Sequence, residues 1–457
     1  MKEQSSFRDP SGHVFYEGGV VYRQVNDCYR AQFASLMESG LYDKLTAEGL
    51  LVSHRNVEGT KTEAEVHCVI APERVPFITY PFEWSFSQLK DAALTTLHIH
   101  RTALDYGMIL KDASGYNIQF LKNTAKLIDT LSFEFYEEGS AWVAYGQFCR
   151  HFLAPLLLMK HVDVRLQQLL RIYIDGIPLD LASKLLKGKN DALTLQHIHW
   201  HAKAIARHTL DGKAQNAQKK VQISKFSHIA LIESLERMIE RLTLDGVKTE
   251  WMDYYDHTNY TQQALARKEE ILEQMLQAGE FSSVWDLGAN DGRFSRVALQ
   301  NGAEIAVAFD IDPLAVEKNY LTGKKSGQNI VPLLFDLTNP SPGIGFGNAE
   351  RMPAEQRMKP DCIIAFAIIH HLAISNNLPL GKIAEWLAKL SGYLIIEFVP
   401  KEDSQVQTLL ATRDDVFPEY NQAGFERAFG EYFLFVQKKD IEGTDRTIYL
   451  CERRTQA

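Results

Sequence analysis

The sequence predicts an α/β fold in the C-terminal half, with seven strands in a doubly wound sheet, preceded by an α+β domain. Three observations lead to this prediction. From Glu280 onward, short apolar runs alternate with helical patterns, as in chains whose parallel strands are joined by helices. The first five runs are continuously apolar, which is typical of strands covered on both faces. A glycine-containing turn, residues 288–292, directly follows the first of them.

Composition limits the class of protein. The chain has 457 residues, which is longer than a domain with a single hydrophobic core usually is. Its 45% hydrophobic and 23% charged residues are typical of globular proteins. A net charge of -9 disfavours a general nucleic-acid binder. The five cysteines form no C-x-x-C pair, and no apolar run is long enough to span a bilayer. We therefore expect a cytoplasmic protein with no membrane partner.

The N-terminal half contains a regularly spaced polar set. Asp112 is followed five residues later by Asn117, and Asp129 follows twelve residues after that, with short apolar runs between them that predict a β-hairpin. The segment "SFSQLKDAALTTLHIHRTALDYGM" predicts a long helix before this set.

"KDASGYNIQF" and "LIDTLSFE" resemble the catalytic and metal-binding loops of the protein kinase and aminoglycoside phosphotransferase superfamily. The resemblance implies a kinase-like domain with an ATP and magnesium site at Asp112, Asn117 and Asp129. The sequence departs from that pattern, because Leu110 replaces the usual histidine, Thr130 and Leu131 follow the metal-binding aspartate, and no glycine-rich loop is present. The alternative is an unrelated α+β domain in which Asp112 and Asn117 shape a turn.

A polar, basic stretch at residues 208–222 predicts an exposed linker, because it has too few apolar side chains to bury. The next segment predicts an amphipathic helix packed between the two halves. Its apolar face comprises Phe226, Ile229, Ile232, Leu235, Met238, Ile239 and Leu242. The predicted organisation is an N-terminal domain at 1–207, a linker and helix at 208–250, and a C-terminal domain at 251–457. Histidines in "HIHWHAKAIARH" lie in a helical pattern, and we predict no metal site there.

The expected strands of the C-terminal sheet follow in order. The last two lie close together and predict an antiparallel hairpin at the sheet edge. The seven runs are "SVWDL", "EIAVAFD", "NIVPLLFD", "DCIIAFA", "YLIIEFV", "EYFLFVQ" and "RTIYLCE".

The turn after the first strand predicts a ligand site. Gly288 and Gly292 allow a tight turn and a close approach of backbone to a ligand. The pattern is D-x-G-x-x-x-G, and Asp286 would repel a pyrophosphate but attract an ammonium group. Asp310, at the end of the second strand, can accept ribose hydroxyls, and Asp336, after the third, can meet an adenine amino group. Together these groups suit S-adenosylmethionine.

Residues 280–457 resemble a class I S-adenosylmethionine-dependent methyltransferase, through "VWDLGANDGRFS", "VAFDIDPLAVEKNY" and "DCIIAFAIIHHLAI". The resemblance implies that Asp286, Gly288 and Gly292 line the methionine end of the cofactor, Asp310 the ribose and Asp336 the adenine. Aromatic residues upstream of the first strand are expected to cover the cofactor. The remaining predicted cofactor-binding residues are Ala289, Asn290, Ile311, Leu337, Ala367 and Tyr255.

Candidate catalytic groups stand at the ends of the fourth and fifth strands: His370, His371 and Glu397. An imidazole has a suitable pKa for accepting a proton near neutrality. The sequence does not choose between the two histidines, since one can face the cleft while the other packs. Lys268 is expected to be a solvated helix residue.

Nearly the whole chain resembles two-domain bacterial methyltransferase-like proteins, some associated with rhizobial nodulation. "FITYPFEWSFSQLKDAAL", "QFCRHFLAPLLL" and "IEFVPKEDSQVQTLL" carry this resemblance. The predicted function is methyl transfer to an unidentified acceptor (a small molecule, a glycoconjugate or a protein) that the N-terminal domain recognises, with nucleic acid disfavoured. The alternatives are a bifunctional protein with an ATP-dependent N-terminal domain, or a non-catalytic scaffold that binds the cofactor.

Overall fold

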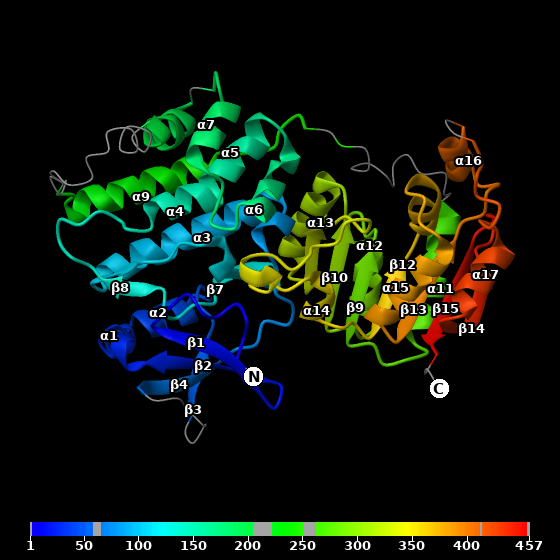
Figure 1. The fold of residues 1–457 in the computed structure, drawn as a ribbon, viewed down its shortest axis with the longest axis horizontal. Helices are drawn as coiled ribbons and strands as arrows, with labels where there is room; N and C mark the ends of the chain where they lie inside the picture. Colours follow the sequence, from blue (N-terminus) through cyan, green and yellow to red (C-terminus); the bar gives the residue numbers. More distant parts are fainter. Residues whose placement is uncertain are drawn as a thin grey trace. The chain divides into compact units, whose positions relative to one another are not determined.

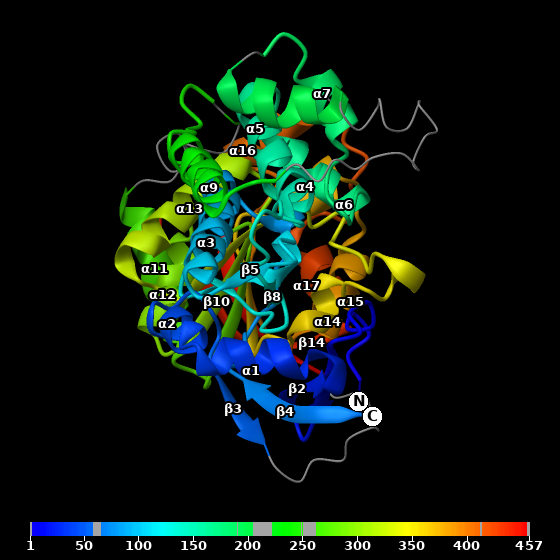
Figure 2. The ribbon, with the colours of Figure 1, turned by 90° about the vertical axis from the view of Figure 1, so that its left-hand side faces the viewer.

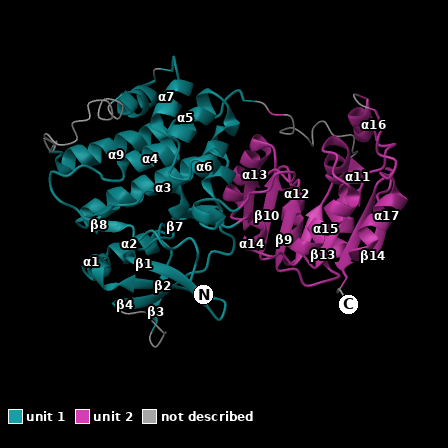
Figure 3. Cartoon of the chain, in the orientation of Figure 1, with its two compact units in different colours: residues 1–247, 343–352 teal, residues 248–342, 353–457 magenta. Residues whose placement is uncertain are grey.

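The computed structural model describes residues 2–57, 65–189, 191–203, 222–247, 249, 262–411 and 414–454. The chain forms two compact units, which Figure 3 distinguishes by colour. The first comprises residues 1–247 and 343–352, and the second comprises residues 248–342 and 353–457. A short segment between two strands of the second unit thus belongs to the first.

The first unit begins with an antiparallel sheet of order β1-β2-β4-β3. Helix α1 lies beside this sheet in Figures 1 and 2. Phe33 of α1 joins Val25 of β2 and Ile70 of β4 in one buried apolar cluster. The elements of this part are β1 (Gly12–Glu17), β2 (Val20–Asn26), α1 (Arg30–Glu38), α2 (Leu41–Ala47), β3 (His54–Val57) and β4 (Val66–Pro72).

The predicted long helix is confirmed as α3 (Phe86–Asp105). Ser85 and Gln88 form a capping box at its start, because each side chain binds the other residue's backbone N–H. The predicted hairpin is also confirmed, as β6 (Ile118–Leu121) paired antiparallel with β7 (Thr124–Leu127). A second pairing joins β5 (Met108–Leu110) to β8 (Phe133–Phe135). A kinase-like fold for this unit stays a prediction.

The predicted amphipathic helix is confirmed as α9 (Lys225–Glu240), and it packs against α3 within the first unit. Its packing between the two halves stays a prediction. Ile232, Leu235 and Ile239 are buried, whereas Phe226 at its first turn is 82% exposed and leaves the predicted face. The other α-helices of the unit are α4 (Tyr145–Phe148), α5 (Ala154–His161), α6 (Leu169–Ile172) and α7 (Leu179–Leu185).

The second unit contains the predicted doubly wound sheet, of strand order β11-β10-β9-β12-β13-β15-β14. The first five strands in sequence run parallel, and β15 pairs antiparallel with both β13 and β14. The predicted hairpin is confirmed, with β14 at the edge. The strands are β9 (Ser283–Leu287), β10 (Ile305–Asp310), β11 (Ile330–Leu334), β12 (Cys362–Ala365), β13 (Tyr393–Phe398), β14 (Phe433–Asp440) and β15 (Thr447–Arg453).

The strand order reverses at β9, because β10 lies on one side of it and β12 on the other. In sheets of this kind a reversal of strand order places the following helices on opposite faces, which predicts a ligand crevice at the carboxyl ends of β9 and β12. The helices are α11 (Gln262–Leu276), α12 (Arg293–Gln300), α13 (Pro313–Ser326), α14 (Ala354–Arg357), α15 (Leu380–Leu390), α16 (Ser404–Leu410) and α17 (Gln422–Gly430).

Helix α11 precedes the sheet in sequence and contributes Ile271, Leu272 and Met275 to its core, together with Ile364 and Ile395 of the central strands. Its position over these strands brings its residues to the crevice. Across the part of the chain that is described, no helix combines the length and apolarity needed to cross a membrane.

Candidate cofactor site

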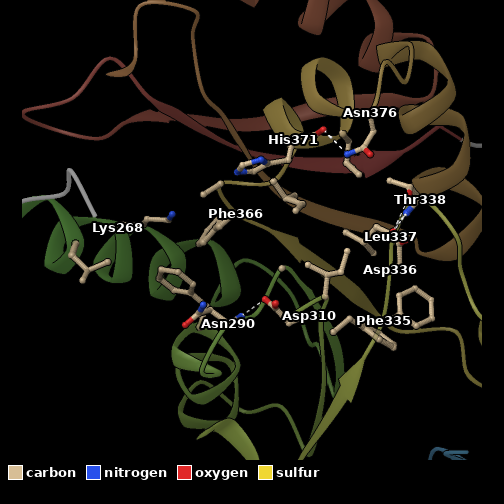
Figure 4. A pocket seen from close by; sticks show the side chains of 18 residues that line it. Lys268, Asn290, Asp310, Phe335, Asp336, Leu337, Thr338, Phe366, His371 and Asn376 are labelled. Carbon is tan, nitrogen blue, oxygen red and sulfur yellow. Dashed lines mark hydrogen bonds between the residues drawn. The ribbon is translucent and has the colours of Figure 1, made fainter. Parts of the chain in front are cut away.

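A pocket lies at the carboxyl ends of the parallel strands in the second unit (Figure 4). Its walls come from the segments that follow β9, β10, β11 and β12, and from α11. This is the place that the reversal of strand order predicts for a ligand. The lining residues are Leu265, Lys268, Gly288, Asn290, Phe294, Phe309, Asp310, Ile311, Phe335, Asp336, Leu337, Thr338, Phe366, Ala367, Ile368, His371, Leu372 and Asn376.

The turn after β9 has the backbone that its glycines suggest. Gly288 lines the pocket with φ of +76°, and a Cβ there would lie 3.3 Å from the Ile368 side chain. Asn290 is also left-handed, at φ of +47°, and its N–H donates to Asp310 Oδ2 over 2.7 Å. The turn therefore presents backbone to the pocket without a side chain at its tightest point.

Gly292 has a different role. A Cβ at this position would lie 2.3 Å from Oδ1 of Asn319, a buried residue of α13, and its φ is +82°. Gly292 is not among the pocket-lining residues, so its lack of a side chain serves the packing of α13 against the turn.

Asp310 is the best-positioned acceptor in the pocket. It is 8% exposed, and Oδ2 and Oδ1 accept the N–H groups of Asn290 and Asp312 at 2.7 and 2.8 Å. Burial raises its pKa to about 6, against the opposing effect of these hydrogen bonds. A carboxylate fixed in this way can accept the paired hydroxyls of a ribose, so the residues present fit the predicted cofactor.

Asp286 and Ala289, two further predicted cofactor residues, are each 1% exposed and do not line the pocket. The Asp286 carboxylate accepts the hydroxyl of Ser295 over 2.7 Å. Burial raises the pKa of Asp286 to about 6 as well. Its contact ties the end of β9 to helix α12, and its position leaves a role toward an ammonium group as a prediction.

The segment after β11 forms the wall of the pocket opposite Lys268 of α11 (Figure 4). Asp336 Oδ1 accepts both the N–H and the hydroxyl of Thr338, at 2.8 and 2.7 Å. The Phe309 and Phe335 rings, 4.6 Å apart, line the same part of the pocket, where a planar base can contact them. Leu337 and Ile311 line it too, and Ile311 is 58% exposed.

The two adjacent histidines differ in position. His371 lines the pocket, whereas His370 is 2% exposed and does not. Burial lowers the pKa of both imidazoles, and for His371 the cation of Arg446 lowers it further. His371 is therefore a neutral imidazole near neutral pH, with a capacity to accept a proton.

The prediction for Lys268 is wrong: its side chain is 2% exposed and lines the pocket. Helix α11 directs it onto the sheet, where Nζ donates to Glu397 Oε2 over 2.7 Å. Charge cannot be buried without a partner, and Glu397 at the end of β13 supplies it. The sequence around Lys268 does not reveal this partner, because Glu397 is 129 residues away.

Glu397, predicted as catalytic, is 0% exposed and does not line the pocket. Besides Lys268, Oε2 accepts the N–H of Ala367 over 2.7 Å, and Oε1 lies 3.6 Å from the Arg446 guanidinium. Ala367 lines the pocket with φ of +51°, a strained value for a residue with a Cβ. The carboxylate thus fixes the turn after β12.

Other predicted positions fall elsewhere. Tyr255 lies outside the described residues, as do the neighbouring aromatic residues expected to cover the cofactor. Sequence reasoning missed several residues of the pocket wall, among them aromatic residues that directly follow a strand or open a helix, a pattern that could have indicated them. The aromatic residues are Phe294, Phe335 and Phe366, and two polar residues, Thr338 and Asn376, were also missed.

In the first unit, the predicted polar set gathers in one place. Asp112 accepts the Gln147 amide over 2.8 Å, and burial and the nearby Asp129 raise its pKa. Asp129, which the phosphotransferase hypothesis assigned to magnesium, instead forms an ion pair with the Arg23 guanidinium at 2.7 Å. Within the described ranges no group of three or more His, Cys, Asp or Glu is arranged to hold a metal ion.

Comparisons with known proteins give the following. No protein-family model matches the chain. Among solved structures, N-methyltransferase NodS from Bradyrhizobium japonicum WM9 is similar at a TM-score of 0.33 and 11% identity, covering 42% of this chain and 98% of that one. Magnesium protoporphyrin IX methyltransferase (ChlM) from Synechocystis PCC 6803, with bound SAH, is similar at a TM-score of 0.31 and 16% identity, covering 45% and 93%.

A full-length relative is much more similar in sequence. Nodulation protein NoeA of Rhizobium meliloti (strain 1021) is 35% identical over 455 residues, which is 98% of this chain and 95% of the relative. The aligned residues span both units, so the similarity is not confined to the sheet of the second unit. The chain belongs to the family of nodulation protein NoeA.

Proposed function

We propose that the second unit binds S-adenosylmethionine and that the protein transfers the cofactor's methyl group to an acceptor. The observation that carries this proposal is Asp310, a pocket-lining carboxylate at the end of β10 whose two oxygens are held in place by backbone N–H groups. In a doubly wound sheet this is the position that binds ribose hydroxyls.

The rest of the pocket supports the same ligand. Asp336 and the Phe335 ring lie one strand further along, beside the place for an adenine. Gly288 leaves room for the ligand's chain between the sugar and the amino-acid end. The cofactor supplies a methyl group on a sulfonium, which is already activated, so this chain's task is to hold the two reactants in line and exclude water.

His371 is the residue that we assign to accept the acceptor's proton. It lines the pocket next to the turn at Ala367, and its lowered pKa keeps it unprotonated near neutrality. Glu397 and His370 are buried behind the wall, so their proposed contribution is to hold the turn that carries His371.

The acceptor is a small molecule, a glycoconjugate or a protein, and the first unit recognises it. The net charge of -9 disfavours nucleic acid as the acceptor. The relative's name associates that protein with nodulation and names no acceptor.

Isothermal titration with S-adenosylmethionine tests the proposal. We expect micromolar binding by the wild-type chain and, for Asp310→Ala, an affinity lower by roughly tenfold to a hundredfold, as for a lost hydrogen bond to a charged group. Asp445→Ala is the matched control, because Asp445 is an exposed aspartate in the turn before β15 of the same unit. Thermal melts establish that both variants are folded.

Equal affinity in the Asp310→Ala variant and the wild type would reject this site, and no binding by the wild type would reject the function. A parallel titration with magnesium-ATP examines the first unit. Binding of magnesium-ATP would support the alternative of a bifunctional protein with an ATP-dependent N-terminal domain.

A further inference from the structure

The strand order fixes the direction in which the cofactor extends. Asp336 follows β11 and Asp310 ends β10, while Gly288 and Asn290 follow β9, and these three strands are consecutive neighbours in the sheet. A ligand whose base lies beside Asp336 and whose ribose lies on Asp310 therefore extends across β9 toward β12. Its amino-acid end reaches the part of the pocket that α11 closes.

Lys268 stands at that end. It contacts Glu397 of β13, and its Nζ lies 4.9 and 4.6 Å from the ring centroids of Phe294 and Phe366. Figure 4 shows Lys268 and Asp336 at opposite sides of the pocket. Among the lining residues of this pocket, within the described part of the chain, Lys268 is the one lysine or arginine.

We propose that Lys268 binds the carboxylate of the cofactor's amino-acid end and so selects ligands that carry it. This inference rests on the proposed function. A carboxylate enters a pocket of this kind only if a cation meets it, because desolvation of an unpaired charge is costly. An ammonium group has three N–H donors and can bind more than one carboxylate at once.

The surroundings of Lys268 hold its side chain in a fixed position and offset part of the cost of burying its charge. The hydrogen bond to Glu397 orients Nζ, and the faces of the two phenylalanine rings attract a cation. Burial lowers the pKa of Lys268, and the Glu397 carboxylate offsets part of that decrease. A second carboxylate from the ligand acts in the same direction as Glu397 and strengthens the charged form.

This arrangement also gives Glu397 a positioning role. Its Oε2 accepts from both Lys268 Nζ and the N–H of Ala367, at 2.7 Å each. The group that orients the cation therefore also holds the strained turn that leads to His371. Occupation of the amino-acid end is linked to the place where methyl transfer occurs.

Two ligands test the inference, because they differ in the amino-acid end. S-adenosylhomocysteine carries the carboxylate, and methylthioadenosine has the same adenosine with no amino-acid group. For Lys268→Met we expect calorimetric affinity for S-adenosylhomocysteine to fall on the order of 30-fold or more, as for a buried ion pair that loses one partner. Affinity for methylthioadenosine should stay within about twofold.

Removing Lys268 alone leaves the buried Glu397 carboxylate without this partner, so a second variant is needed. Lys268→Met combined with Glu397→Gln removes both charges of the pair, and the amide oxygen can still accept from Ala367 N–H. This double variant should show the same selective loss with a melting temperature closer to that of the wild type.

Equal loss for both ligands, or no loss for either, in the folded double variant would overturn the assignment of Lys268. These outcomes differ from a failure of the proposed function, in which the wild-type chain binds neither ligand nor S-adenosylmethionine. Binding of both ligands by the wild type with no effect of Lys268 retains the function and rejects only this inference.

Discussion

Two aspartates at the ends of neighbouring strands, Asp286 and Asp310, differ in what their carboxylates contact. Both are nearly inaccessible, and burial raises the pKa of each to about 6. Asp310 reaches the pocket, while Asp286 accepts the Ser295 hydroxyl inside the unit. Sequence position does not distinguish the two aspartates, whereas their contacts show that only the Asp310 side chain lines the pocket.

The raised pKa of Asp310 predicts a pH dependence of cofactor affinity. Ribose hydroxyls donate to the ionised carboxylate, so protonation of Asp310 below about pH 6 weakens binding. Affinity should rise with pH, by up to about tenfold per unit below that value, and level off above it. Calorimetric titrations between pH 5 and 8 measure the effect.

Asp310→Asn is the control for this prediction, since an amide does not titrate. Its weaker binding should lose this part of the pH profile. Asp286, whose pKa is also raised to about 6, can add a slope of its own in the same range. An unchanged profile in the variant would contradict the assignment. In the ligand-free protein the sign is opposite, because a folded-state pKa above the ordinary 3.8 lowers stability as pH rises toward 6.

At the scale of elements, the turn between β9 and α12 combines two requirements. Gly288 faces the pocket, and Gly292 faces helix α13. The first position lines the pocket and the second serves packing, although both have positive φ. The two glycines of this turn are therefore required for different reasons, one by the pocket and the other by helix α13.

Gly292→Ala should lower the free energy of unfolding by about 2–4 kcal/mol, because backbone strain adds to overpacking against Asn319. Gly302→Ala is the matched control, with φ of +103° and no atom within 4 Å of the added Cβ, so it tests strain without the clash. Urea unfolding of the two variants measures the difference. A Gly292→Ala cost equal to that of the control would contradict the packing role, whereas Asn319→Ala should reduce it.

At the scale of the whole molecule, the chain does not divide into two consecutive segments. Residues 343–352, between β11 and β12, belong to the first unit. Glu350 in this segment is 2% exposed and binds Arg8 through two hydrogen bonds of 2.5 and 2.9 Å. Within the same unit, the Tyr80 hydroxyl accepts the N–H of Met352, and the Arg351 guanidinium lies over the Tyr116 ring. Stability of the first unit thus depends on a segment that the sequence places among the strands of the second.

Arg8→Ala should destabilise the first unit by about 1–3 kcal/mol, since it leaves the buried Glu350 carboxylate with fewer partners. Arg165→Ala is the control, because Arg165 pairs with Asp163 at an exposed site in the same unit, where an ion pair contributes about 1 kcal/mol or less. Hydrogen exchange of helix α3 amides reports on the first unit by itself. Similar effects of the two variants would contradict the prediction.

The sequence by itself determined the seven-strand sheet and the position of its ligand crevice. Continuous apolar runs, the turn after "SVWDL" and acids at the strand ends depend on local patterns, which burial on both faces and backbone geometry impose on consecutive residues. For the same reason helix α3, the hairpin β6–β7 and helix α9 were predictable from periodicity.

The tertiary structure alone decided which of these residues meet. Lys268 and Glu397 are 129 residues apart and form one ion pair, His371 reaches the pocket while His370 does not, and Glu350 joins the first unit. From local sequence, a charged side chain on a helix is expected to be exposed to solvent. It can be buried when a partner of opposite charge offsets the cost, and that partner can be distant in the sequence, as Glu397 is from Lys268. Long-range pairing of charges, and not local propensity, brought Lys268 to the wall of the pocket.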